Sequence, residues 1–158
     1  QWARQAGAEA VYGIHRSPVH AQRLAEMGIV PIAQHDTTAV NAAAAQAEVV
    51  YDATGGSLAE TILSVMPETG TFVCYGLLSG QTFRQQRPLP RVAWFHIRNY
   101  LDALSAEAWQ AEFRRIWPKL RASQCSDVTL YPLSEWQRAV GNYREAGRTG
   151  KPMLSMDN

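Results

Sequence analysis

The sequence predicts an α/β fold in which helices alternate with the strands of a parallel sheet. Three observations favour this class. The chain has 158 residues, 46% of them hydrophobic, which is enough for one domain with a core. In the first half, short apolar segments rich in β-branched and aromatic residues alternate with helical segments. The links between them are short and contain Gly, Pro, Ser or Asp. This order is typical of a doubly wound sheet with helices on both faces.

The elements of the first half follow from local signals. Gly7 ends a helix that is already under way at the first residue. Ser17 can cap the next helix, Asp36 or Thr37 the third, and Ser57 the fourth. We therefore expect strands at residues 10–15, 29–33, 47–53 and 70–78, and helices at residues 1–6, 18–27, 37–46 and 57–66.

The second half departs from this regular alternation. Residues 81–91 form a polar, proline-containing loop, and the apolar run at 92–101 predicts a long strand. Ser105 can cap a helix over residues 106–122, whose aromatic face we expect in a core. Ser134 can cap a helix from residue 135 to about residue 146. Two short strands complete the expected order, one at residues 127–133 and one in the closing segment 147–156.

Composition limits the possible functions. The formal net charge is +1 and there is no basic run, so we expect no nucleic-acid partner. No apolar stretch approaches the ~20 residues of a membrane span. Cys74 and Cys125 do not form a C-x-x-C motif, and no secretion signal is present. A reducing, cytoplasmic location is therefore expected. The four histidines are scattered, so no metal site is expected.

The start of the chain is unusual for this fold. A doubly wound nucleotide-binding domain begins with a strand and a Gly-rich turn that opens the first helix. This sequence begins inside that helix, so the first strand and the Gly-rich turn are expected to be missing. The missing strand would lie between the strands at 10–15 and 47–53. We expect a fragment of a longer protein, whose gap is filled by rearranged pairing or by a partner chain.

The order of the segments resembles a known family. "QWARQAGAEAVYGIHRS", "RLAEMGIVPI" and "AEVVYDATGGSLAETILSVMPETGTFVCYGLLSG" resemble the cofactor domain of the medium-chain dehydrogenase/reductase superfamily. The segments "AWFHIRNYLDALSAEAWQAEF" and "YPLSEWQRAVGNYREAGRTGKPMLSM" resemble its zinc-free quinone oxidoreductase and 2-enoyl thioester reductase branch. The resemblance implies that the whole chain, residues 1–158, is a partial Rossmann-type domain whose C-terminal helix and strand return to a catalytic domain. It implies that the N-terminal catalytic domain is absent.

The residues after the first strand indicate the type of cofactor. An NAD-specific site of this fold has an acid at this strand end, which binds the ribose hydroxyls. This chain has His15, Arg16 and Ser17 instead. A guanidinium and a hydroxyl favour a phosphate, so we expect NADP, with Arg16 at the 2′-phosphate. The alternative is that Arg16 is a solvated loop residue.

The stretch "VVYDATGG" ends the third expected strand, where open α/β sheets bind ligands. Asp52 has no local acid–base partner and no companion metal ligands, so we expect it to brace the turn through backbone amides. The resemblance implies that Ala53, Thr54 and Gly55 lie beside the nicotinamide and its ribose. Small residues there leave room for a cofactor.

Further candidates come from the resemblance. Tyr75, Gly76 and Leu77 follow the fourth strand and would line the nicotinamide pocket, although an ordinary strand end is an equal alternative. Phe95 would lie near the carboxamide, or else in a core or dimer-edge strand, because related proteins pair through this region. Lys151 would reach the cofactor, although such a lysine is more often solvated.

The resemblance implies that the parent protein is an NADPH-dependent oxidoreductase that reduces an enoyl thioester, an enone or a quinone. No catalytic residue is expected in this chain, because the family's enolate stabilisation comes largely from the missing domain, and the fragment alone is expected to be inactive. A homodimer is expected. One alternative is a non-catalytic truncated module that survives as an oligomer. A methyltransferase that uses S-adenosylmethionine is a further alternative, although "VYGIHRSPVH" lacks its Gly-rich loop.

Overall fold

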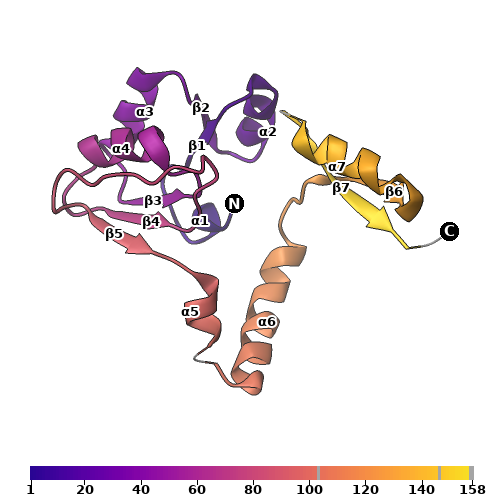
Figure 1. Ribbon diagram of the computed structural model, residues 1–158. Helices are drawn as coiled ribbons and strands as arrows, with labels where there is room; N and C mark the ends of the chain where they lie inside the picture. Colours follow the sequence, from indigo (N-terminus) through magenta and orange to yellow (C-terminus); the bar gives the residue numbers. More distant parts are fainter. Residues whose placement is uncertain (103, 146, 157–158) are drawn as a thin grey trace. The chain divides into compact units, whose positions relative to one another are not determined.

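The computed structural model describes residues 1–102, 104–145 and 147–156. The chain forms two compact units, one made of residues 1–33 and 117–158 and the other of residues 34–116. The described residues form seven strands and seven α-helices, which alternate along the chain except that β5 follows β4 and α6 follows α5 (Figure 1). The strands are β1 (Tyr12–His15), β2 (Val30–Ala33), β3 (Val49–Asp52), β4 (Thr71–Cys74), β5 (Arg91–Trp94), β6 (Asp127–Pro132) and β7 (Gly150–Ser155). The α-helices are α1 (Trp2–Gln5), α2 (Ala21–Glu26), α3 (Thr37–Ala44), α4 (Gly56–Val65), α5 (Ile97–Leu101), α6 (Ala106–Arg121) and α7 (Trp136–Arg144).

All strand pairs among the described residues are parallel, as the sequence predicts. They form three separate sheets with the orders β1-β2, β3-β4-β5 and β6-β7. In the described residues β1 pairs only with β2, and β3 only with β4. No rearranged strand pairing therefore occupies the expected position next to β1 and β3.

The core of the second unit lies between α3, α4 and one face of the β3-β4-β5 sheet (Figure 1). Asp52 is in register with Cys74, and Val50 with Phe72, so these four side chains point to the same face. Phe72 and Cys74 are fully buried there. Val49 and Tyr51, which alternate with them, are 49% and 69% exposed. The opposite face of β3 is therefore open within this unit.

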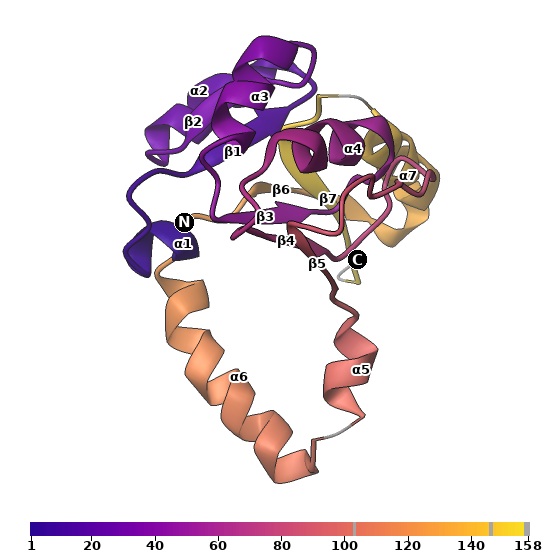
Figure 2. The ribbon, with the colours of Figure 1, turned by 90° about the vertical axis from the view of Figure 1, so that its left-hand side faces the viewer.

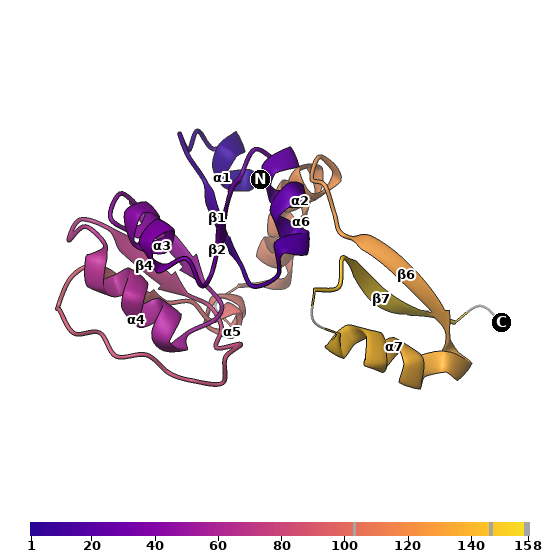
Figure 3. The ribbon, with the colours of Figure 1, turned by 90° about the horizontal axis from the view of Figure 1, so that it is seen from above.

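In the first unit, α2 packs beside the β1-β2 pair (Figure 2). The β6-β7 pair is covered by α7 (Figure 3). The start of the chain is tied to the end of α6, because the side chain of Gln1 both donates to the Gln124 carbonyl and accepts from the Gln124 amide, each at 2.8 Å. The indole N–H of Trp2 donates to Ser123 Oγ at 2.8 Å. This unit thus combines the N-terminal segment, residues 1–33, with the C-terminal segment, residues 117–158.

The helix starts agree with the predicted caps at two of five positions. Asp36 accepts the Ala39 amide at 3.0 Å, and Ser105 accepts the Ala108 amide at 3.2 Å. Ser17 precedes a short 3-10 turn (Pro18–His20) without a side-chain cap bond. The predictions of caps at Ser57 and Ser134 are wrong. Gly55 precedes α4 with φ of 69°, so the glycine pair turns the chain into the helix.

Two other predictions are corrected. The apolar run at 92–101 is not one strand, because β5 ends at Trp94 and α5 begins at Ile97, after His96 accepts the Arg98 amide through Nδ1. The aromatic face of α6 is not in a core, since no residue of that helix is buried. The expected end of the following helix near Ala146 lies outside the described residues, and α7 ends at Arg144.

Candidate functional site

The carboxyl end of β1 carries the first group of predicted site residues. His15 is the last residue of the strand, and its Nδ1 is enclosed without a hydrogen-bond partner among the described residues. Arg16 is exposed, and neither its guanidinium nor the Ser17 hydroxyl bonds to another described residue. The chain therefore presents donors for an anion at this strand end, with no internal acid using them.

The turn after β3 is organised by Asp52. This residue is 5% exposed, and its carboxylate accepts the Thr54 amide at 3.0 Å through Oδ1 and the Gly55 amide at 2.9 Å through Oδ2. These two bonds fix the backbone between the strand and α4. The structure thus agrees with the expected bracing role.

The turns after β3 and β4 are joined through their backbones. The Leu78 amide donates to the Ala53 carbonyl at 2.8 Å, and the Ser79 amide to the Thr54 carbonyl at 3.0 Å. The first helical residue, Gly56, donates its amide to the Gln81 carbonyl at 3.1 Å. The predicted residues of the two strand ends therefore form one connected structure in this unit.

Glycines allow the close contacts in this structure. A Cβ on Gly55 would lie 2.5 Å from Leu77 Cδ2 and 2.7 Å from the Gln81 carbonyl oxygen. A Cβ on Gly76 would lie 3.1 Å from the Ala53 carbonyl oxygen. The Leu77 side chain therefore covers the backbone of Gly55. The part played by Gln81 has no signal in the sequence, because its contacts here are made by a backbone carbonyl that every residue type carries.

The remaining predicted residues are Tyr75, Phe95 and Lys151. Tyr75 is 55% exposed and follows β4 directly, with its amide bonded to the Asp52 carbonyl at 2.8 Å. Phe95 is 49% exposed and follows β5, with its amide bonded to the Cys74 carbonyl at 2.8 Å. Lys151 belongs to the other unit, where it lies on β7 in register with Val128 and is exposed.

Cys74 lies beneath this structure at the end of β4. Burial raises the pKa of its thiol, and the nearby Asp52 carboxylate raises that pKa further. The thiol donates to the Gly76 carbonyl at 3.4 Å. Cys74 is therefore a protonated, structural thiol at neutral pH and not an activated nucleophile.

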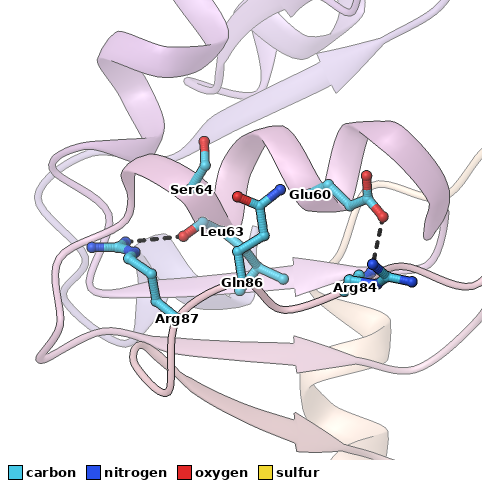
Figure 4. A pocket seen from close by; sticks show the side chains of 6 residues that line it. All are labelled: Glu60, Leu63, Ser64, Arg84, Gln86 and Arg87. Carbon is cyan, nitrogen blue, oxygen red and sulfur yellow. Dashed lines mark hydrogen bonds between the residues drawn. The ribbon is translucent and has the colours of Figure 1, made fainter.

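A small hollow of about 50 Å³ lies elsewhere in the second unit, between α4 and the loop after β4. Figure 4 shows Glu60 bonded to the Arg84 amide and the Arg87 guanidinium bonded to the Leu63 carbonyl, at 2.9 Å and 3.0 Å. Arg87 also donates to the Met66 carbonyl at 3.0 Å, near the end of α4. These contacts hold the loop on the helix. The hollow is far smaller than the ~300 Å³ or more of a ligand pocket.

No cluster of three or more His, Cys, Asp or Glu side chains among the described residues could hold a metal ion. No described helix combines the length and the apolar character needed to cross a bilayer.

Parallel strands, crossover helices and small residues at the strand ends define a Rossmann-type α/β fold. The family model described as "Zinc-binding dehydrogenase" matches residues 1–120. The chain therefore belongs to this family of medium-chain dehydrogenases/reductases. No curated protein matches the sequence.

Solved structures share the fold. A Bacillus thuringiensis protein described as an NADPH:quinone reductase has a TM-score of 0.78 and 22% identity, over 92% of this chain and 48% of its own. The CurK enoyl reductase has a TM-score of 0.73 and 20% identity, over 98% of this chain and 49% of its own. A mycobacterial protein solved with NADPH has a TM-score of 0.75 and 16% identity, over 97% of this chain and 50% of its own. This chain thus spans about half the length of these proteins.

Proposed function

We propose that this chain is the cofactor-binding part of a zinc-free, NADPH-dependent oxidoreductase. The whole enzyme would reduce the activated C=C bond of an enoyl thioester or enone, or a quinone. The observation that carries the choice of cofactor is the end of β1, where the Arg16 guanidinium and the Ser17 hydroxyl bond to no other described residue and the next residues carry no acid. Membership of the family and the likeness to NADPH:quinone and enoyl reductases support the reaction class.

The residues present fit the adenosine end of NADP. The Arg16 guanidinium and the Ser17 hydroxyl offer hydrogen bonds to a 2′-phosphate, and His15 would flank them at the end of the strand. A carboxylate at this position would repel that phosphate and would favour the ribose hydroxyls of NAD. We propose that Arg16 makes the main ionic contact. Lys151 is a more distant candidate in the same unit.

In the other unit, Ala53, Thr54 and Gly55 would face the nicotinamide and its ribose, with Tyr75, Gly76, Leu77 and Phe95 around them. The backbone bonds between the two turns give this surface a fixed shape before any ligand arrives. Bound NADPH supplies a hydride. This chain's residues would position the nicotinamide and exclude water from it, and stabilisation of the enolate oxygen would come from the catalytic domain that we propose for the whole enzyme.

Titration of tryptophan fluorescence tests this proposal. We expect the chain to bind NADPH weakly and to prefer it over NADH, with no response to S-adenosylmethionine. We also expect no turnover of an enone by the isolated 158-residue chain. A response to S-adenosylmethionine alone would favour a methyltransferase instead. Equal affinity for NADH and NADPH would contradict the role given to Arg16.

We also propose that the protein forms a homodimer through the edge of the β3-β4-β5 sheet. β5 is the outer strand; Trp94 at its end is 61% exposed, and Ile97 at the start of α5 is 51% exposed. An outer strand has unpaired backbone groups that can pair with a second chain. The same observation supports the alternative of a non-catalytic module that persists as an oligomer. A dimer that does not respond to NADPH would favour that alternative.

A further inference from the structure

The turn after α7 packs directly against the end of β1. Gly147 has φ of 76°, and a Cβ on it would lie 3.0 Å from Ser17 Oγ and 3.6 Å from Val19 Cγ1. A residue with a side chain would therefore push the turn away from Ser17. The glycine brings two distant parts of the sequence together at the proposed phosphate-binding position.

Arg23 of α2 holds the next part of the same turn. Its Nη2 donates to the Cys125 carbonyl at 2.6 Å, and its Nη1 donates to the Thr149 carbonyl at 3.3 Å. Its Nη1 also lies 4.0 Å from Asp127 Oδ2. The turn is thus fixed at Gly147 by packing and at Thr149 by a hydrogen bond. Arg148 lies between these two fixed points.

The Arg148 side chain is itself held in place, and one of its nitrogens is left free. Nε donates to the Tyr143 carbonyl and Nη1 to the Gly150 carbonyl, each at 3.1 Å. The guanidinium carbon lies 4.5 Å from the centre of the Tyr143 ring. Nη2 donates to no other described residue. A guanidinium fixed in this way loses little conformational entropy when it binds an anion.

We propose that Arg148 is a second phosphate-binding arginine, which acts with Arg16 on the 2′-phosphate of NADP. The inference rests on the proposed function. A phosphate monoester carries a charge of about −1.5 to −2 at pH 7, which one guanidinium does not neutralise. Arg16 follows β1 directly, and Gly147, the neighbour of Arg148, contacts Ser17. The two arginines therefore belong to chain segments that meet at Ser17.

Binding of adenosine 2′,5′-bisphosphate and of 5′-AMP to the 158-residue chain, measured by calorimetry, tests this inference. The two ligands differ by the 2′-phosphate. We expect Arg148→Gln to weaken binding of the bisphosphate about 10-fold or more, as a lost charge-assisted bond implies, and to leave 5′-AMP unchanged. Arg148→Lys should retain part of the preference, because it keeps the charge but not the planar fork.

Arg144→Gln is the matched control. Arg144 ends α7 and is exposed, and its side chain makes no hydrogen bond to another described residue. We expect it to change neither affinity, and a thermal melt of each variant will report on folding. Equal weakening of both nucleotides by Arg148→Gln, with a lower Tm, would mean that Arg148 only braces the turn and would overturn the inference.

The two proposals fail in different ways. If the unmodified chain prefers the bisphosphate and Arg148→Gln keeps that preference, the inference about Arg148 is wrong and the proposed function stands. If the unmodified chain binds the two nucleotides equally, or binds neither, both proposals are wrong for this chain.

Discussion

Asp52 and Gly55 are joined by a buried hydrogen bond of 2.9 Å, in which the Gly55 amide donates to Oδ2 of the aspartate. The other carboxylate oxygen accepts the Thr54 amide at 3.0 Å. Asp52 therefore satisfies two backbone donors at the point where β3 turns into α4. Asp52, the acid that ends this apolar strand, therefore stabilises the turn that follows it.

Asp52→Ala removes the acceptor of both amides. We expect the free energy of unfolding to fall by about 1–3 kcal/mol, because buried donors are left unsatisfied. Asp52→Asn keeps one acceptor oxygen and should cost less. Urea denaturation followed by circular dichroism measures both. Asp102→Ala, at an exposed position, is the control and should stay within about 0.5 kcal/mol of the parent. Equal losses at the two positions would contradict the bracing role.

Gly55→Ala tests the close approach of the two strand ends. Gly55 has φ of 69° and ψ of −158°, a region open essentially to glycine alone. A Cβ there would also meet Leu77 and the Gln81 carbonyl. Gly80 is a matched control, because its φ is 70° and a Cβ would meet nothing within 4 Å.

We expect Gly80→Ala to lower the free energy of unfolding by about 1–2 kcal/mol from backbone strain alone. Gly55→Ala should cost at least about 1.4 kcal/mol more, which is a tenfold change in the folding equilibrium. Adding Leu77→Ala should recover only part of that difference, since the Gln81 carbonyl remains. Equal costs at the two glycines would show that the contacts of Gly55 do not matter.

Periodicity and short links were enough to predict the parallel α/β class and most element positions. β1, β2, β3 and β4 lie inside the predicted ranges, since apolar runs of strand length with Gly or Asp after them are local signals. Periodicity could not predict the division into three sheets or the exposed face of α6. Both depend on which segments pack against each other, and local sequence patterns do not describe that packing.

For the candidate site, the sequence indicates the strand ends but not the contacts across the chain. Gly55 and Gly76 were predicted as small residues at strand ends, and the structure joins their turns by backbone bonds. The sequence places Gly147 at the start of the closing segment 147–156 and indicates no partner for it. Its contact with Ser17 links segments from opposite ends of the chain, and a single sequence carries no signal for such a contact.

The buried Cys74 thiol predicts a pH dependence of stability. Its pKa is raised in the folded state, first by burial and then by Asp52. The folded state therefore holds the thiol proton more tightly than the unfolded state. The contribution of this group to stability is constant at neutral pH and falls as the pH rises above the unfolded thiol pKa of about 8.5.

Urea denaturation at pH 7 and pH 9.5 measures this effect. The difference in the free energy of unfolding between the two pH values should be smaller for Cys74→Ala than for the parent chain. Cys125→Ala is the control, because Cys125 is exposed and its removal should leave the difference unchanged. An unchanged pH dependence in Cys74→Ala would show that the thiol does not contribute.

The proposed homodimer predicts a specific response to charge at the edge of the β3-β4-β5 sheet. Ile97 begins α5, shortly after the end of the outer strand in the sequence, and is 51% exposed. Ile97→Glu would place a carboxylate in an apolar interface, where an unpaired charge is strongly unfavourable. Sedimentation velocity should then show a shift from dimer to monomer. Leu78→Glu is the control, since Leu78 is 85% exposed in the loop after β4 and should keep the dimer. A monomeric parent chain, or a dimer that tolerates Ile97→Glu, would reject this edge as the interface.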